Sequence, residues 1–337
     1  MLVHLRLVVP PQLADETRAL LLAETYATNV TWADGQSIRP PGALVGVDVT
    51  RETADELIDR LIGLGLAGEG AISVTTPEAT PFDEAERLDE AARGEPDDSV
   101  LWSVVIDQAT AAAQGSWTFY AFLVLATVLA GVAVLTDSPI LVVGAMVVGP
   151  DFGPVGAFCA GVVLRRWKLA LRAARLLTVG YLWAVLLVAG LALLGRFAGV
   201  VTPAMVAADR PMTGFIWRPD LWSVIVAVVA GIVGSLALAT EKSNTLVGVF
   251  IAVTTIPAAG NLAVASATGV TDEMVGSATQ LVVNIIGMLV GGIATLWVER
   301  VAGDRFHLRP ATKVGAWLRA AGRSWRAHRP PRRRAGR

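Results

Sequence analysis

One carboxylate lies in the middle of a long apolar stretch. Residues 138–163 are long enough to cross a bilayer, and Asp151 lies near their centre, within the run GAMVVGPDFGPVG. An isolated carboxylate in hydrocarbon is costly unless it is paired, protonated or bound to a cation, so Asp151 is the first candidate for a binding or transport site. The alternative is structural, because aspartate is a favoured N-cap and could accept bonds from the amides of a following half-helix.

A second polar set is uncharged and lies in the run TTIPAAGN and in the apolar segment that follows it. Its members are Thr254, Thr255, Asn261, Gln280 and Asn284. Hydroxyl and amide oxygens form a neutral lining that suits a dehydrated cation or a small polar solute. The alternative is that Gln280 and Asn284 only join helices by hydrogen bonds, and that Thr254 binds the carbonyl of its own preceding turn.

Both polar sets coincide with residues that interrupt a helix. The predicted helix-break residues are Gly149, Pro150, Gly153, Pro154, Pro257 and Gly260. Proline removes an amide donor and glycine permits turns that other residues resist. Within hydrocarbon, a helix is broken only where protein or a wet cavity satisfies the freed backbone groups. We therefore expect two broken helices that enclose a site between them.

The composition favours a membrane protein. The chain has 337 residues, of which 54% are hydrophobic and 17% charged, and its mean hydropathy is +0.57. Its charges are unevenly placed: residues 1–98 hold 19 acidic and 7 basic side chains, whereas residues 300–337 hold 12 basic side chains and one acidic. A chain with these shares of hydrophobic and charged residues is too apolar for an ordinary soluble protein of this length.

Six apolar segments are long enough to cross a bilayer. They are residues 117–135, 138–163, 174–194, 221–240, 243–270 and 275–298. Five basic residues separate the second segment from the third (Arg165, Arg166, Lys168, Arg172 and Arg175), whereas the loop after the third holds only Arg196, Arg210 and Arg218. By the positive-inside rule, we expect a multi-pass protein of the bacterial plasma membrane with both termini in the cytoplasm.

The two halves of this region share a plan. Aligning Pro150 with Pro257 also pairs Gly153 with Gly260, and a serine opens both broken segments. Because each half has three segments, an odd number, the second half must be inverted relative to the first. This predicts a 3+3 inverted repeat, as in many secondary transporters. The alternative is a six-helix bundle with two proline kinks.

Four regions follow from these patterns. Residues 1–78 alternate strand and helix patterns in the order βαββαβ, which predicts a small ferredoxin-like cytosolic domain. Residues 79–115 are expected to form an acidic linker and an amphipathic helix at the membrane surface. Residues 116–300 form the transmembrane domain, and residues 301–337 a basic cytoplasmic tail attracted to anionic lipid headgroups.

Catalytic motifs are absent from the sequence. There is no P-loop, HExxH or GxSxG, and the three histidines lack partners at metal-ligand spacing. The pattern GLGLAG at 63–68 follows a predicted helix, which is the reverse of the order that a dinucleotide site needs. We expect no enzyme activity, no cofactor, no metal and no nucleic-acid partner.

Residues 115–300 resemble the bacterial and archaeal membrane family called domain of unknown function 389. The runs GAMVVGPDFGP, AGIVGSLAL and GVFIAVTTIPAAGNLAVA carry the resemblance. It implies a polytopic membrane fold and leaves the activity open. The family pattern implies an apolar residue where this chain has Asp151, so a role for Asp151 would belong to a subgroup.

The sequence thus predicts a membrane transporter or channel for an ion or small polar solute, acting as a homodimer regulated by its cytosolic domain. A membrane-bound metabolite sensor or scaffold without transport is the rival hypothesis. The substrate, the coupling ion and the choice between channel and alternating access stay open.

Overall fold

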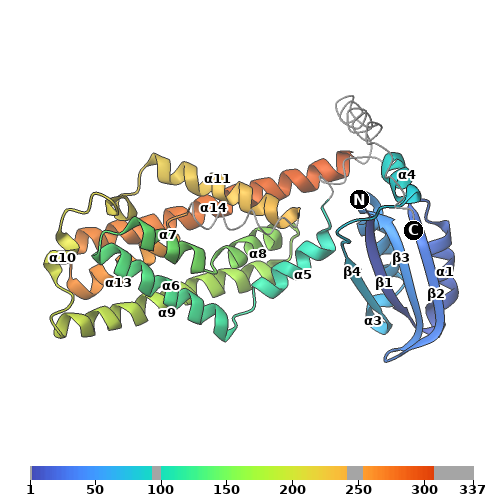
Figure 1. Ribbon diagram of the computed structural model, residues 1–337, viewed down its shortest axis with the longest axis horizontal. Helices are drawn as coiled ribbons and strands as arrows, with labels where there is room; N and C mark the ends of the chain where they lie inside the picture. Colours follow the sequence, from blue (N-terminus) through green and yellow to red (C-terminus); the bar gives the residue numbers. More distant parts are fainter. Residues whose placement is uncertain (1, 93–99, 241–252, 307–337) are drawn as a thin grey trace, which may run out of the picture. The chain divides into compact units, whose positions relative to one another are not determined.

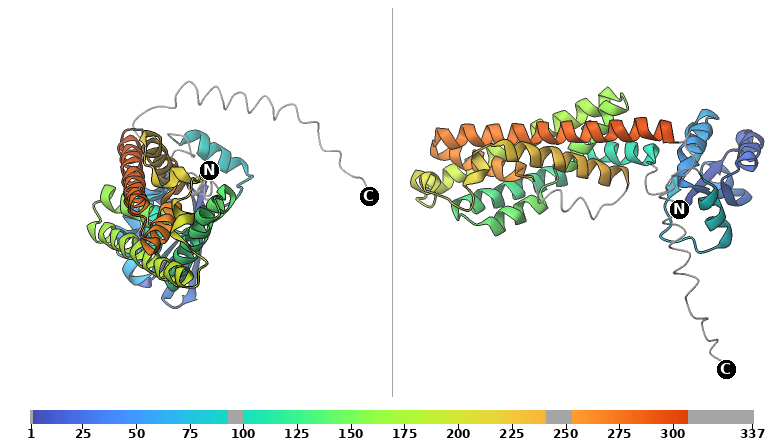
Figure 2. Two further views of the ribbon diagram at one scale, coloured as in Figure 1. Left: turned by 90° about the vertical axis from the view of Figure 1, so that its left-hand side faces the viewer. Right: turned by 90° about the horizontal axis from the view of Figure 1, so that it is seen from above.

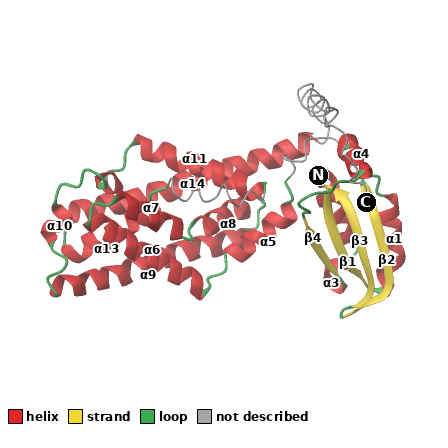
Figure 3. Ribbon diagram, viewed as in Figure 1, coloured by secondary structure: helices red, strands yellow, loops and turns green. Residues whose placement is uncertain are grey.

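The computed structural model describes residues 2–92, 100–240 and 253–306 (Figure 1). The chain divides into two compact units. The first comprises Met1–Ser103 with Val301–Arg337, and the second comprises Val104–Arg300. The strands lie in the first unit, whereas the second is helical (Figure 3).

The first unit contains a small antiparallel sheet of four strands. Their order is β2-β3-β1-β4, and β1 pairs antiparallel with both β3 and β4. The strands are β1 (Leu2–Val9), β2 (Ala27–Ile38), β3 (Pro41–Thr50) and β4 (Ala71–Thr75). The helices are η1 (Pro11–Leu13), α1 (Ala14–Ala23), α2 (Arg51–Gly63), α3 (Leu66–Glu69) and α4 (Asp83–Ala91).

The sequence periodicity explains this sheet. Along β1, Leu5, Leu7 and Val9 are buried, whereas the intervening Arg6 is exposed, as expected where one face of a sheet is covered. Helix α2 packs on β1 and β3 and buries Leu57 with its neighbours. Strand β2 is long because its pairing with β3 continues to Ile38.

The second unit is a bundle of helices. They are α5 (Trp102–Ala112), α6 (Trp117–Leu135), α7 (Pro139–Val148), α8 (Phe152–Val163), α9 (Trp167–Phe197), α10 (Pro203–Ala207), η3 (Gly214–Trp217), α11 (Leu221–Ala239), α13 (Thr255–Thr268) and α14 (Thr271–Phe306).

Four of the described helices, α6, α9, α11 and α14, are long and apolar enough to cross a membrane. The pair α7 and α8 passes the same test as one span broken by a bend of 51°. This agrees with the predicted break in residues 138–163. Helix α13 covers the second half of the predicted segment 243–270, whereas residues 241–252 lie outside the described part of the chain.

Close helix contacts in the bundle occur at glycines. A side chain at Gly260 of α13 would lie 2.5 Å from the Ala130 Cβ atom of α6. A side chain at Gly231 of α11 would lie 2.2 Å from the Met288 carbonyl oxygen of α14, and α11 and α14 run alongside each other (Figure 2). Small residues thus allow backbones to approach closely, as is common between membrane helices.

Candidate functional site

The break between α7 and α8 comprises residues 149–151. Pro150 and Pro154 cannot donate backbone hydrogen bonds, and Pro154 lies in the first turn of α8, where such a donor would have no partner within the helix. A side chain at Gly149 would meet the Ile256 side chain at 2.6 Å. Glycine at 149 therefore lets this break lie directly against the first turn of α13.

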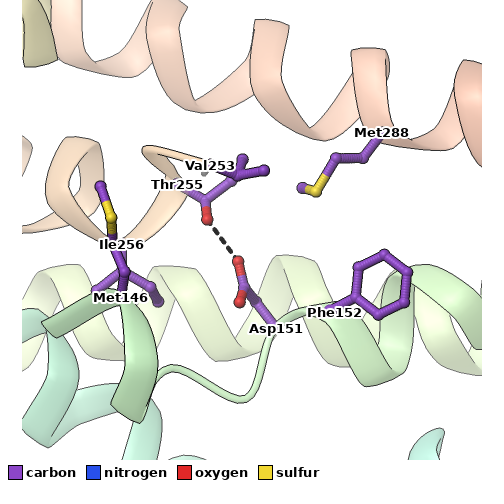
Figure 4. A pocket seen from close by; sticks show the side chains of 7 residues that line it. All are labelled: Met146, Asp151, Phe152, Val253, Thr255, Ile256 and Met288. Atoms are coloured by element: carbon purple, nitrogen blue, oxygen red, sulfur yellow. Dashed lines mark hydrogen bonds between the residues drawn. The ribbon is translucent and has the colours of Figure 1, made fainter. Parts of the chain in front are cut away.

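Helix α13 begins at Thr255, beside the break, with Pro257 in its first turn. The starts of α8 and α13 therefore face the same small region (Figure 4). The start of a helix carries partial positive charge from its free amides, so two such starts favour a carboxylate between them.

Asp151 occupies that position, and only 7% of it is exposed. Its Oδ2 atom accepts hydrogen bonds from the Tyr181 hydroxyl at 2.7 Å and from Thr255 Oγ1 at 2.5 Å. Asp151 is the N-cap residue of α8, but its side chain accepts no bond from the amides of that helix. The structural alternative, that this side chain caps the half-helix, does not hold, because the side chain bonds residues of α9 and α13 instead.

A small hollow adjoins the carboxylate (Figure 4). It is lined by Met146, Asp151, Phe152, Val253, Thr255, Ile256 and Met288. Its free space is on the order of one water molecule. Two of the predicted site residues, Asp151 and Thr255, line this hollow, and the rest of its wall is apolar.

Thr254, Gln280 and Asn284 form a second cluster. The Thr254 hydroxyl oxygen accepts bonds from Gln280 Nε2 at 3.1 Å and from Asn284 Nδ2 at 2.9 Å. Both donors belong to α14, so these bonds join α14 to the residue that precedes α13. Gln280 Oε1 is buried without a hydrogen-bond partner among the described residues.

Asn261 belongs to a third cluster, two turns along α13 from Thr254. Its Nδ2 atom donates to Ser277 Oγ at 2.8 Å and to Glu273 Oε2 at 3.2 Å, and its Oδ1 atom accepts from Arg210 Nη1 at 3.1 Å. Arg210 and Glu273 also form a buried ion pair. The sequence interpretation grouped Asn261 with Asp151, whereas the structure joins it to the charged residues Arg210 and Glu273.

Four residues of these clusters were missed from the sequence: Tyr181, Arg210, Glu273 and Ser277. Tyr181 lies in the apolar middle of the long helix α9, and no spacing rule identifies its partner. Glu273 and Ser277 could have been found, because they continue the helical spacing of Gln280 and Asn284 towards the start of α14. In residues 2–92, 100–240 and 253–306, no group of three or more histidine, cysteine, aspartate or glutamate side chains could hold a metal ion.

These features define a helical protein whose apolar helices suit a membrane, with a broken helix that presents a buried carboxylate to a second helix start. The family described as "Domain of unknown function (DUF389)" matches residues 146–290, which include all three clusters. The match supports the assignment of this part of the chain to that family.

One relative is an uncharacterized protein of Methanocaldococcus jannaschii. The two chains are 23% identical over 268 residues, which is 78% of each. No solved structure matches the chain.

Proposed function

We propose that the protein is a membrane transporter or channel for an ion or small polar solute, with its site where α8 and α13 begin. The observation that carries this proposal is the position of Asp151. It is a buried carboxylate at a helix break, held by Thr255 and Tyr181 next to a hollow.

The cost of this arrangement supports a functional role. A broken span frees backbone groups, and a buried carboxylate must be desolvated, so each feature alone would be selected against in a purely structural bundle. No salt bridge to Asp151 occurs within the described ranges. Its charge is balanced by hydroxyl donors and helix starts, an arrangement that a passing ion or polar group can replace.

The hollow has little free space, so on this proposal a solute would have to displace side chains to enter it. Met146, Val253 and Met288 are flexible or small apolar walls that suit such a change. We propose no enzymatic reaction.

We further propose that residues 116–300 form six spans arranged as a 3+3 inverted repeat. Two observations support this. The first is that α13 starts at a proline-containing turn, as α8 does. The second is the packing of glycines between the halves. Gly260 of α13 packs on Ala130 and Gly131 of α6, and Gly234 of α11 packs on Phe152 of α8. In each case the first helix of one half packs against the broken helix of the other.

The proposed orientation has both termini in the cytoplasm of a bacterial cell. The basic residues between α8 and α9 and in the first part of α9 support it by the positive-inside rule. The basic tail, residues 301–337, is proposed to bind anionic lipid headgroups, each basic side chain near the surface contributing about 1 kcal/mol. These residues lie almost wholly outside the described part of the chain.

For the first unit we propose a ferredoxin-like domain that regulates transport within a homodimer. Its support is the βαββαβ order and the antiparallel strand order β2-β3-β1-β4. The regulatory role is an analogy, since small sheets of this kind often pair across a two-fold axis.

Flux in proteoliposomes tests the proposed function. The purified full-length chain is reconstituted, and uptake of radiolabelled sodium, rubidium, chloride and glycerol is compared with uptake by protein-free vesicles. We expect flux of at least one probe, abolished by Asp151→Asn and reduced by Asn261→Ala. Asp107→Asn, at an exposed position of α5, is the matched control and should leave the flux unchanged.

Vesicles that stay as tight as protein-free ones to every probe would contradict transport. If metabolite binding were then found only in residues 1–78, the sensor hypothesis would replace it.

A further inference from the structure

Helix α14 carries a stripe of buried polar side chains on one face. Its members are Glu273, Ser277, Gln280 and Asn284, spaced by four, three and four residues. The intervening Val275 and Val282 are exposed, as expected for a face towards lipid. At about 1.5 Å per residue the stripe rises about 16 Å, roughly half of a hydrocarbon core about 30 Å thick.

The stripe contacts polar groups of α13 and of the residue before it, one near each end. Asn261 bonds Ser277 and Glu273 at one end, and Thr254 bonds Gln280 and Asn284 at the other. Thr254 is followed directly by Thr255, which bonds Asp151. Polar side chains therefore recur from the start of α14 to the residue next to Thr255, which bonds the buried carboxylate.

Two atoms in this run lack hydrogen-bond partners among the described residues: Gln280 Oε1 and Arg210 Nε. Both residues are more than nine-tenths buried. Leaving a buried polar atom unsatisfied costs about 1–3 kcal/mol, so a network built only to join helices would pair them. Open hydrogen-bonding positions along the run mark where water or a polar solute would bind.

The Arg210–Glu273 pair closes one end of the run. Arg210 precedes η3 and Glu273 lies in the first turn of α14, and at most 6% of either residue is exposed. A buried ion pair contributes little net stability because both charges are desolvated, and its best-attested use is to select one of two states. The amide of Asn261 contacts both charges, so it holds the two elements in register.

We infer that the polar stripe of α14 is the outer half of the solute path and that the Arg210–Glu273 ion pair is its gate. This inference rests on the proposed function and on the proposed orientation. When the ion pair breaks, the loop before η3 is no longer held to α14. The polar stripe of α14 is then open to the outer side of the membrane as far as Gln280. The neutral lining beyond the pair suits a small polar solute.

Cysteine accessibility tests the path without any measurement of flux. Ser277→Cys and Asn284→Cys are made in a Cys159→Ala background, since Cys159 is the chain's single cysteine and is buried. Reconstituted protein is treated from the outer side with a charged, membrane-impermeant methanethiosulfonate. Val282→Cys, between the two positions but on the exposed face, is the control and should stay unlabelled.

We expect slow labelling of Ser277→Cys with the ion pair intact and labelling at least tenfold faster when Glu273→Gln is added. Because a lone buried charge at Arg210 can unfold the bundle, the exchanged pair Arg210→Glu with Glu273→Arg is also made. It restores the ion pair and should restore slow labelling.

The path would be overturned if Ser277→Cys in the Glu273→Gln protein is labelled no faster than Val282→Cys. Labelling of Ser277→Cys only from the inner side would overturn it as well. Faster labelling in the exchanged pair, in protein that elutes as folded, would overturn the gate. If the vesicles stay sealed in the flux assay but Glu273→Gln still speeds the labelling of Ser277→Cys, transport is rejected. The polar path and its gate are then kept.

Discussion

The Thr255 hydroxyl donates to Oδ2 of Asp151 over 2.5 Å and so joins two helix starts that are 104 residues apart in the sequence. The bond lies where α8 and α13 approach each other, and Tyr181 of α9 donates to the same oxygen. Three helices therefore meet at one carboxylate. The stability of the bundle and its proposed function depend on the same few atoms.

Thr255→Val should destabilise the bundle, because it removes one of two hydroxyl donors from a buried charge. Hydrogen bonds to charged groups contribute about 1.5–3 kcal/mol, and we expect a loss of this size in SDS-induced unfolding of the purified protein. Thr279→Val is the matched control, since the Thr279 hydroxyl is exposed and bonds only the carbonyl of Val275 in its own helix. Equal losses in the two variants would mean that the bond to Asp151 has no special weight.

Tyr181→Phe should cost a similar amount, and its effect should couple to that of Thr255→Val. Each single variant leaves Oδ2 with one donor, whereas the double variant leaves a buried charged oxygen with neither. The combined loss should therefore exceed the sum of the single losses by about 0.5–3 kcal/mol, the usual range for residues in one network. Additive losses would show that the two hydroxyls act independently. Tyr120→Phe, at a partly exposed tyrosine, controls for loss of a hydroxyl.

The elements of this fold follow from local signals in the sequence. The apolar run 117–135 becomes α6 with the same ends, because Ser116 accepts a bond from the Phe119 amide and begins the helix. The break after Val148 follows from glycine and proline placement, which acts over a few residues. Such signals need no knowledge of distant partners.

The pairings within the site could not be predicted in this way. Arg210 lies in a segment interpreted as an outer loop, yet its guanidinium is buried against Glu273, 63 residues later. Nothing local distinguishes a solvated arginine from a paired one. Similarly, Asp151 had a plausible local role as a helix cap, and only the approach of α9 and α13 gives it other partners.

Gly260→Ala should destabilise the bundle through steric overlap. A Cβ atom at this position would lie 2.5 Å from the Ala130 Cβ atom and 2.7 Å from the Gly131 amide nitrogen, so α6 and α13 would have to separate. Overpacking of this kind costs about 1–3 kcal/mol. Gly190→Ala in α9 is the control, because a Cβ atom there meets nothing within 4 Å and alanine favours the helix. Unfolding in SDS compares the two, and a loss in Gly190→Ala as large as that in Gly260→Ala would argue against the contact.

The stability of the first unit should depend on pH through Glu52. This carboxyl is 8% exposed, and neither of its oxygens has a hydrogen-bond partner within the described ranges. Burial raises the pKa of Glu52 above its ordinary value of 4.5, and the nearby Asp89 raises it further. Because the folded state holds the proton more tightly than the unfolded chain, stability is fully present below the ordinary pKa and is lost as the pH rises through the folded pKa.

Glu52→Gln replaces the carboxyl with a neutral group of the same shape, so it should stabilise the first unit at pH 8 and have a smaller effect as the pH falls towards 4.5. Hydrogen–deuterium exchange of β1 and β3 amides in the full-length protein measures this, with variant and wild type compared at each pH. Glu56→Gln is the control, since the Glu56 side chain is exposed beside Arg60 and a surface pair of this kind contributes little. A stabilisation by Glu52→Gln that is the same at pH 5 and pH 8 would mean that the carboxyl stays protonated over this range and that its charge does not limit the stability of the sheet.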